Sequence, residues 1–108
     1  MAQETINKCT VSGYITNTAG ASVESEAVTF NLSYDTAKYG DNTAIKNVTQ
    51  TATTDSDGFF TIGLVENDSM GSGAFYTATI NTVEYRIKVP NESTADFWEL
   101  VNNSLRRV

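Results

Sequence analysis

The chain has no histidine among its 108 residues, and it has only one cysteine and one proline. Without histidine, the usual general base of Ser-His and Cys-His enzymes is missing, together with the commonest zinc ligand. The single cysteine, Cys9, has no partner for an internal disulfide, and its place in an alternating segment predicts a buried apolar side chain. We therefore expect a protein that is not an enzyme and that needs no cofactor or metal.

Basic residues are also scarce, and long apolar runs are missing. Thirteen acidic residues against seven basic ones give a net charge of −6 at pH 7, which disfavours nucleic acid as a partner. A membrane-spanning helix needs a run of about 18 apolar residues, and the sequence has none. Residues 1–7 have neither the basic start nor the apolar stretch of a secretory signal. We expect a soluble protein made in the cytoplasm, with no membrane partner.

What the chain does have is short segments in which apolar residues alternate with polar ones. The alternation is clear from Cys9 to Ile15, from Val28 to Tyr34 and from Val83 to Val89. A period of two is typical of β-strands that turn one face to a core. The inward-facing residues of the last two segments are expected to be Val28, Phe30, Leu32, Tyr34, Val83, Tyr85, Ile87 and Val89.

Asp55, Asp57 and Gly58 form the strongest turn signal, between an expected strand at 44–54 and another at 59–65. Aspartate side chains accept hydrogen bonds from turn N–H groups, and glycine adopts the positive φ that such turns need. Asp55 and Asp57 also match a fragment of a calcium-binding loop, but the preceding acid and the distal glutamate are missing. We therefore predict a metal-free structural turn that closes a β-hairpin.

A second hairpin is predicted between strands at 75–80 and 83–89, which are joined by Asn81-Thr82. Two other segments, 35–42 and 66–73, combine glycine with charged residues and are predicted to be exposed loops. The second of these loops is expected to be the most mobile internal segment.

The pattern changes to helical spacing after Pro90. Ser93 followed by Asp96 resembles a helix-capping signal and predicts a helix at about 94–103. Two interpretations of this segment stay open: the helix covers an open end of its own sandwich, or it docks on another subunit. In the second interpretation the partner-binding residues are Phe97, Trp98, Val101, Leu105, Arg106 and Arg107.

Together these signals predict a single all-β domain, an antiparallel β-sandwich of six to seven strands with a short C-terminal helix. Residues 1–7 would form a flexible N-terminal arm, residues 8–90 the sandwich, and residues 91–108 the helical segment and tail. A chain of this length buries enough surface for one core.

Several stretches resemble a known family. Residues 11–15 (Val-Ser-Gly-Tyr-Ile) and 54–60 (Thr-Asp-Ser-Asp-Gly-Phe-Phe), with the turn at Gly20 and the apolar strand at 28–32, resemble the carboxypeptidase regulatory-like domains. The resemblance spans about residues 9–89 and implies an immunoglobulin-like or transthyretin-like β-sandwich. It also implies a non-catalytic module that serves in scaffolding, adhesion or assembly.

The tail from Ile87 to Leu100 is similar to the ends of small bacteriophage virion proteins that use this module on its own. This resemblance implies a virion structural protein, most simply a capsid decoration or cement protein that binds the major capsid protein lattice, with homo-oligomer formation left open. A tail accessory subunit is the nearest alternative. From another class, a carbohydrate-binding or adhesin module would stack sugar rings on an exposed Tyr14, Tyr39 or Trp98.

Overall fold

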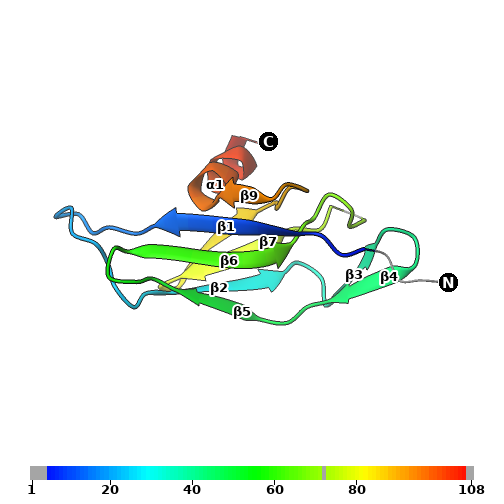
Figure 1. Ribbon diagram of the computed structural model, residues 1–108, viewed down its shortest axis with the longest axis horizontal. Coiled ribbons are helices and arrows are strands. Elements are labelled where there is room, and N and C mark those ends of the chain that lie inside the picture. The colour runs from blue at the N-terminus through cyan, green and yellow to red at the C-terminus, as the bar shows by residue number, and fades with distance from the viewer. Residues whose placement is uncertain (1–4, 72, 107–108) are drawn as a thin grey trace.

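The computed structural model describes residues 5–71 and 73–106, with side chains as far as Asn103. Over these residues the chain forms nine strands followed by one helix (Figure 1). The elements are β1 (Lys8–Tyr14), β2 (Ala27–Leu32), β3 (Thr36–Tyr39), β4 (Thr43–Lys46), β5 (Gln50–Thr53), β6 (Phe59–Val65), β7 (Tyr76–Ile80), β8 (Val83–Ile87), β9 (Thr94–Asp96) and α1 (Phe97–Arg106). The all-β class and the short C-terminal helix are confirmed, while the strands exceed the six to seven expected.

Most strands belong to two sheets, which together form a sandwich-like domain. One sheet has the strand order β6-β1-β9 and the other has the order β5-β2-β7-β8, while β3 and β4 pair only with each other. In the described part of the chain every strand pairing is antiparallel except that of β1 with β9, which is parallel. The domain is elongated, with extents of 54 × 30 × 23 Å, and Figure 1 shows the β3–β4 hairpin at one end, on the side where β1 begins.

The core lies between the two sheets and follows the predicted alternation in most places. The buried residues that the alternation predicts are Cys9, Val11, Val28, Phe30, Leu32, Ile87 and Val89. Tyr85 is half-buried, and two expected core residues are exposed instead, Tyr34 by 43% and Val83 by 51%. Tyr34 lies beyond the end of β2, and Val83 is the first residue of the edge strand β8, so the facing sheet covers neither.

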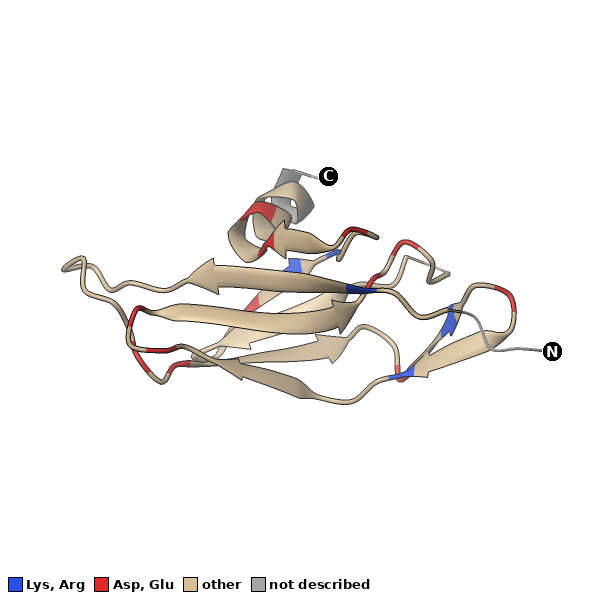
Figure 2. Cartoon of the chain, in the orientation of Figure 1, with Lys and Arg blue, Asp and Glu red and all other residues tan. Residues whose placement is uncertain are grey.

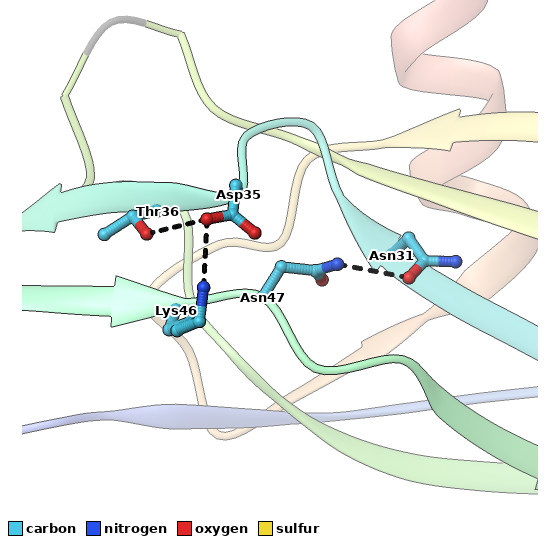
Figure 3. Close-up of polar contacts among 5 residues, drawn as sticks. All are labelled: Asn31, Asp35, Thr36, Lys46 and Asn47. Atoms are coloured by element: carbon cyan, nitrogen blue, oxygen red, sulfur yellow. Dashed lines mark hydrogen bonds and ion pairs between the residues drawn. The ribbon is translucent and has the colours of Figure 1, made fainter.

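The part of the chain after β2 differs from its sequence-based prediction. Residues 36–39 form β3 rather than an exposed loop, and the strand expected at 44–54 is divided into β4 and β5. Asn47 causes the break: its Oδ1 accepts the N–H of Leu32 at 2.8 Å, and its Nδ2 donates to Asn31 Oδ1 at 3.2 Å (Figure 3). These side-chain bonds replace the backbone ladder and separate the two strands.

The turn at Asp55–Gly58 has the predicted local structure but not the predicted topology. Gly58 has a φ of +75°, and a Cβ added there would collide with the carbonyl oxygen of Ile15. Asp55 Oδ1 accepts the N–H groups of Asp57 and Phe59 at 2.8 and 3.1 Å. However, β5 and β6 belong to different sheets, so the turn crosses between the layers and does not close a hairpin.

The hairpin of β7 and β8 is confirmed, with Ile80 paired to Val83. Asn81 and Thr82 between them both have positive φ, 47° and 70°. Successive residues with positive φ form the type of turn whose twist matches that of the flanking strands. The β-branched side chain of Thr82 makes this conformation strained.

The C-terminal helix begins later than its capping signal predicts. Residues 94–96 form β9, whose parallel pairing with β1 extends the sheet. Asp96, not Ser93, is the N-terminal cap, because its Oδ2 accepts the N–H of Glu99 at 3.0 Å. The carbonyl oxygen of Ser93 instead accepts the N–H of Thr10 at 2.9 Å. Residues 94–96, which the sequence pattern assigns to the first turn of the helix, therefore form a strand instead.

Candidate functional site

Phe97, the first residue of α1, is fully buried in the core. Its ring makes T-shaped contacts with Phe30, Phe60 and Tyr85, at centroid distances of 6.0, 5.4 and 6.2 Å. Gly13 makes room for it, since a Cβ there would lie 3.0 Å from the Phe60 ring and 3.3 Å from the Cβ of Phe97. A partner contact through Phe97 would therefore require the helix to leave its own core.

The rest of the helix packs against the same sandwich. Leu100 and Val101 are buried, and the half-buried Trp98 donates its indole N–H to the carbonyl oxygen of Tyr14 at 3.0 Å. The Trp98 ring also contacts Tyr85 in a T-shape at 5.3 Å. Of the two interpretations of the helix, these contacts favour the one in which α1 covers its own sandwich.

The remaining residues predicted to bind a partner are Leu105, Arg106 and Arg107. The side chains of Leu105 and Arg106 lie outside the described part of the chain, and so does the whole of Arg107. A partner contact through these three residues stays a prediction.

Two pairs of aromatic rings, Tyr14 with Phe59 and Tyr85 with Trp98, are connected through the backbone at the end of β1, and we call them the aromatic patch. Tyr14 is directly opposite Phe59 in the β1–β6 pairing, and their rings lie 5.0 Å apart at 53°. Tyr14 is 61% exposed, while the other three residues are half-buried. The hydrogen bond from Trp98 to the Tyr14 carbonyl joins the two pairs. The β1–β6 pairing and the helix, which is held by the buried Phe97, therefore fix the positions of these rings before any partner binds.

Tyr39, the third aromatic residue considered for sugar binding, is buried and unavailable to a ligand. Its hydroxyl donates to Oε2 of the buried Glu66 at 2.6 Å and accepts the N–H of Asn7 at 3.1 Å. The other carboxylate oxygen of Glu66 accepts the N–H of Ser69 at 2.9 Å. We call Tyr39, Glu66 and Ser69 the polar latch, because they connect the β3–β4 hairpin to the loop after β6.

The polar latch holds Glu66 as a buried carboxylate. Burial raises the pKa of Glu66, but the hydrogen bonds from Tyr39 and Ser69 outweigh it and bring the pKa below its ordinary 4.5. Burial and the hydrogen bond to Glu66 raise the pKa of Tyr39 above its ordinary 10.0. At neutral pH the pair is therefore a carboxylate with a neutral phenol as its donor.

Sequence reasoning misses this cluster, because it predicts an exposed loop at 66–73. Glu66, Asn67 and Met70 are buried there. The backbone N–H of Asn67 donates to the Val89 carbonyl, and the Val89 N–H donates to Asn67 Oδ1, both at 2.7 Å. Asn67 thus takes the place of a strand partner, and no local signal distinguishes such a residue from a solvent-exposed asparagine.

A solvent-open groove of about 670 Å³ lies beside α1, between the helix, β9 and the chain around Pro90. The charged residues that line it are Asp68, Lys88, Glu92, Asp96 and Glu99. Figure 2 shows acidic residues on α1 and on the loop before β9. Carboxylates outnumber the single ammonium group here, so the groove has a negative potential.

The β3–β4 hairpin carries an exposed ion pair. Lys46 Nζ lies 2.9 Å from Asp35 Oδ2, and Thr36 Oγ1 donates to the same oxygen at 3.4 Å (Figure 3). The hydrogen bond from Lys46 lowers the pKa of Asp35, and its positive charge acts in the same direction. Exposed pairs of this kind add little stability, so the ion pair orients side chains without anchoring the hairpin.

The predicted turn residues Asp55, Asp57 and Gly58 lie in the turn between the sheets, where Asp55 accepts the backbone N–H groups of Asp57 and Phe59. Within residues 5–71 and 73–106, no three acidic or cysteine side chains gather closely enough to hold a metal ion, and no helix is long and apolar enough to cross a membrane. A scan against models of known protein families finds no match for the chain, and a search of curated proteins finds none either.

Proposed function

We propose that the protein is a non-enzymatic structural subunit of a bacteriophage virion, which decorates the capsid by binding the lattice of the major capsid protein. The resemblance of the chain to small virion proteins supports this proposal. The observation that carries it is the exposure of Tyr14, 61%, at the end of a paired strand. Tyrosine and tryptophan are enriched at the energetic centres of protein–protein interfaces. We therefore assign lattice binding to the aromatic patch.

The packing behind the patch suits it to binding. The buried Phe97 and the hydrogen bond of Trp98 hold the neighbouring rings in one arrangement. Binding of a partner therefore costs little side-chain conformational entropy. A capsid also presents many equivalent sites at high local density. A modest affinity at each site is then sufficient for occupancy of the shell.

Co-sedimentation with purified capsid shells of the encoding phage tests the proposal. Tyr14→Ala removes the most exposed ring of the patch and should weaken retention about tenfold. Tyr34→Ala is the matched control, because Tyr34 is 43% exposed but follows β2, whose end lies opposite to that of β1 (Figure 1). Equal retention of both variants would contradict the assignment to the aromatic patch. Wild-type protein that binds neither shells nor tails would contradict the virion proposal, and binding to tails alone would make it a tail accessory subunit.

Carbohydrate binding is the second candidate function, and the exposed Tyr14 with the half-buried Phe59 beside it favours it. Surface aromatic rings stack on the apolar faces of sugars. Trp98 is the only tryptophan in the chain, and its contact with Tyr14 makes its fluorescence a reporter of ligands at the patch. A glycan-array hit whose saturable fluorescence change is lost in Tyr14→Ala would favour this function, and an array without hits would remove it.

A further inference from the structure

The edges of the two sheets are protected very unequally. The edge strands β5 and β9 have four and three residues, and β8 carries Glu84 and Arg86 and packs against α1. The remaining edge strand, β6, has seven residues and no charge, with the sequence Phe-Phe-Thr-Ile-Gly-Leu-Val. Short strands, charges and covering elements are the devices by which proteins prevent edge-to-edge pairing. Neither shortness nor charge protects β6, and covering contacts reach only its two ends, Phe59 and Val65.

Hydrogen bonds at the two ends of the β1–β6 ladder show which backbone groups of β6 point outward. The Ile15 N–H donates to the Gly58 carbonyl at 2.8 Å, and the Glu66 N–H donates to the Asn7 carbonyl at 3.1 Å. Bonded positions alternate along an antiparallel pair. The even-numbered residues of β6 therefore direct their N–H and C=O groups to β1, and the odd-numbered residues direct theirs to the open edge.

The two ends of this edge already have partners within the chain. Phe59 exchanges hydrogen bonds with Asp55, whose N–H donates to the Phe59 carbonyl at 2.9 Å and whose Oδ1 accepts the Phe59 N–H at 3.1 Å. At the other end, the Tyr76 hydroxyl donates to the Val65 carbonyl at 2.8 Å. The outward-pointing residues between them, for which the described chain provides no such partner, are Thr61 and Gly63.

We propose that this open edge pairs with the same edge of a second copy of the chain, antiparallel and about a two-fold axis through Ile62. Thr61 of each copy then faces Gly63 of the other, and each such pair exchanges N–H···O=C bonds in both directions. The three-stranded sheets of the two copies then join over residues 61–63, because Asp55 already occupies the edge beside Phe59, where Val65 of the partner subunit would otherwise pair. Because the interface uses the same surface twice, it closes at a dimer.

The side chains of β6 favour a second copy over an unrelated strand. Ile62 lies on the core side yet stays half-buried, whereas its neighbours Phe60 and Leu64 are buried. On the two-fold axis, the two Ile62 side chains face each other in a non-hydrogen-bonded pair, where cross-strand side chains approach most closely. Because β6 has no charge, the pairing brings no like charges face to face, although each chain has a net charge of −6.

Lys8 on the outer face of the sheet allows a charge test of this geometry. A Cβ at Gly63 would lie 3.6 Å from Lys8 Cε and 3.9 Å from its Nζ, so the lysine side chain lies over Gly63. In the dimer, Thr61 of one copy therefore lies next to Lys8 of the partner subunit. A lysine introduced at position 61 meets a like charge there, whereas a glutamate meets an opposite one.

Sedimentation equilibrium of the full chain, over a series of concentrations, measures the dimer. The wild-type chain should dimerise with a Kd below about 1 mM, and Thr61→Lys should raise the Kd at least about tenfold. Thr61→Glu should leave the Kd equal or lower it. Thr51→Lys is the matched control, because Thr51 is an exposed threonine on the edge strand β5 of the other sheet, and it should leave the Kd unchanged.

Three sedimentation results would overturn the proposal: a wild-type chain that stays monomeric at about 1 mM, equal effects of the two lysine substitutions, or oligomers larger than a dimer. Thermal unfolding of each variant checks that it folds. Retention of Thr61→Lys on capsid shells, with the dimer lost, would separate this interface from the lattice-binding patch.

Amide hydrogen exchange of the wild-type chain provides a readout that needs no substitution. The amides of Thr61 and Gly63 should become protected as the protein concentration rises, because they gain partners only in the dimer. The even-numbered amides of β6 should be protected at every concentration, because β1 holds them in the monomer. Exchange at positions 61 and 63 that does not depend on concentration would overturn the proposed pairing.

Discussion

The C-terminal helix and the β3–β4 hairpin are both attached to the outside of the two main sheets, but by different chemistry (Figure 1). The helix is anchored by buried apolar side chains, those of Phe97, Leu100 and Val101. The hairpin is anchored through the polar latch, in which the Tyr39 hydroxyl donates to Glu66. Apolar packing is indifferent to pH, whereas a buried carboxylate requires both its charge and its donors. The two segments should therefore respond differently to mutation and to acid.

Backbone bonds beside the latch show how limited the attachment of the hairpin is. The Gly40 N–H donates to the Ser69 carbonyl at 3.0 Å, and the Gly71 N–H donates to the Lys38 carbonyl at 3.2 Å. In the described chain, neither β3 nor β4 pairs with a strand of the main sheets. The hairpin itself buries Ala37 and Tyr39. We therefore expect it to open at a lower free energy than the helix, whose release exposes three buried apolar side chains.

Phe97→Ala should have the largest effect. It removes a fully buried ring together with its aromatic contacts, so the free energy of unfolding should fall by about 3–5 kcal/mol. Urea denaturation followed by Trp98 fluorescence measures this loss. Val48→Ala is the control, because Val48 is 70% exposed and its truncation should cost less than about 0.5 kcal/mol. Similar losses for the two variants would show that α1 is not part of the core.

Glu66→Gln should have the next largest effect, and the loss should be concentrated in the hairpin. The amide keeps the size of the side chain but turns one of two accepting oxygens, which face Tyr39 and Ser69, into a donor. The expected cost is about 1–3 kcal/mol, measured by thermal unfolding and by amide exchange in β3 and β4. Asp57→Asn makes the same chemical change on an exposed turn and should be nearly neutral. Wild-type exchange of the hairpin in Glu66→Gln would contradict the role given to the latch.

Acid should weaken the hairpin before it weakens the helix. The folded-state pKa of Glu66 lies below its ordinary 4.5. The stability that this carboxylate contributes is therefore fully present above pH 4.5 and is lost as the pH falls through the folded-state pKa. The difference in Tm between wild type and Glu66→Gln should shrink as the pH falls from about 7 to about 3. A difference that stays constant over this range would rule out the depressed pKa.

Thr82→Gly should have the smallest effect, and in the opposite direction. Glycine relieves the positive φ of 70° at this position, and after its entropic cost the gain should be roughly 0.5–1 kcal/mol. Because the turn joins two strands of a main sheet, urea denaturation should show higher global stability with unchanged opening of β3–β4. Thr79→Gly, within β7, serves as the control and should destabilise. Destabilisation by Thr82→Gly would show that the turn is not strained.

Structure could be predicted from the sequence where the partners of a residue lie close along the chain. Asp55 and Gly58 indicate the correct turn, because the N–H groups that Asp55 satisfies lie no more than four residues away. The same residues do not indicate that β6 pairs with β1 rather than β5, since that choice depends on distant segments. The local pattern makes Ser93 a plausible helix cap. In the structure its carbonyl oxygen instead accepts the N–H of Thr10, in the distant strand β1.

The candidate site divides in the same way. Tyr14 and Trp98 can each be predicted as candidate surface aromatics, but the bond that joins them spans 84 residues of sequence. Glu66 and Tyr39 lie 27 residues apart, in segments whose glycine and charge content is typical of loops. Their burial depends on each other, and no short-range pattern records a polar side chain that is satisfied by a distant partner.

Amide hydrogen exchange across a series of low urea concentrations tests the contrast between the two segments most directly. The amides of α1 around Leu100 and Val101 should exchange only through global unfolding, with a free energy that falls steeply as urea is added. The amides of β3 and β4 should exchange through a smaller local opening that is nearly independent of urea and becomes easier in Glu66→Gln. Equal free energies and equal urea dependence in α1 and in the β3–β4 hairpin would contradict the account, because the hairpin would then unfold only together with the sandwich.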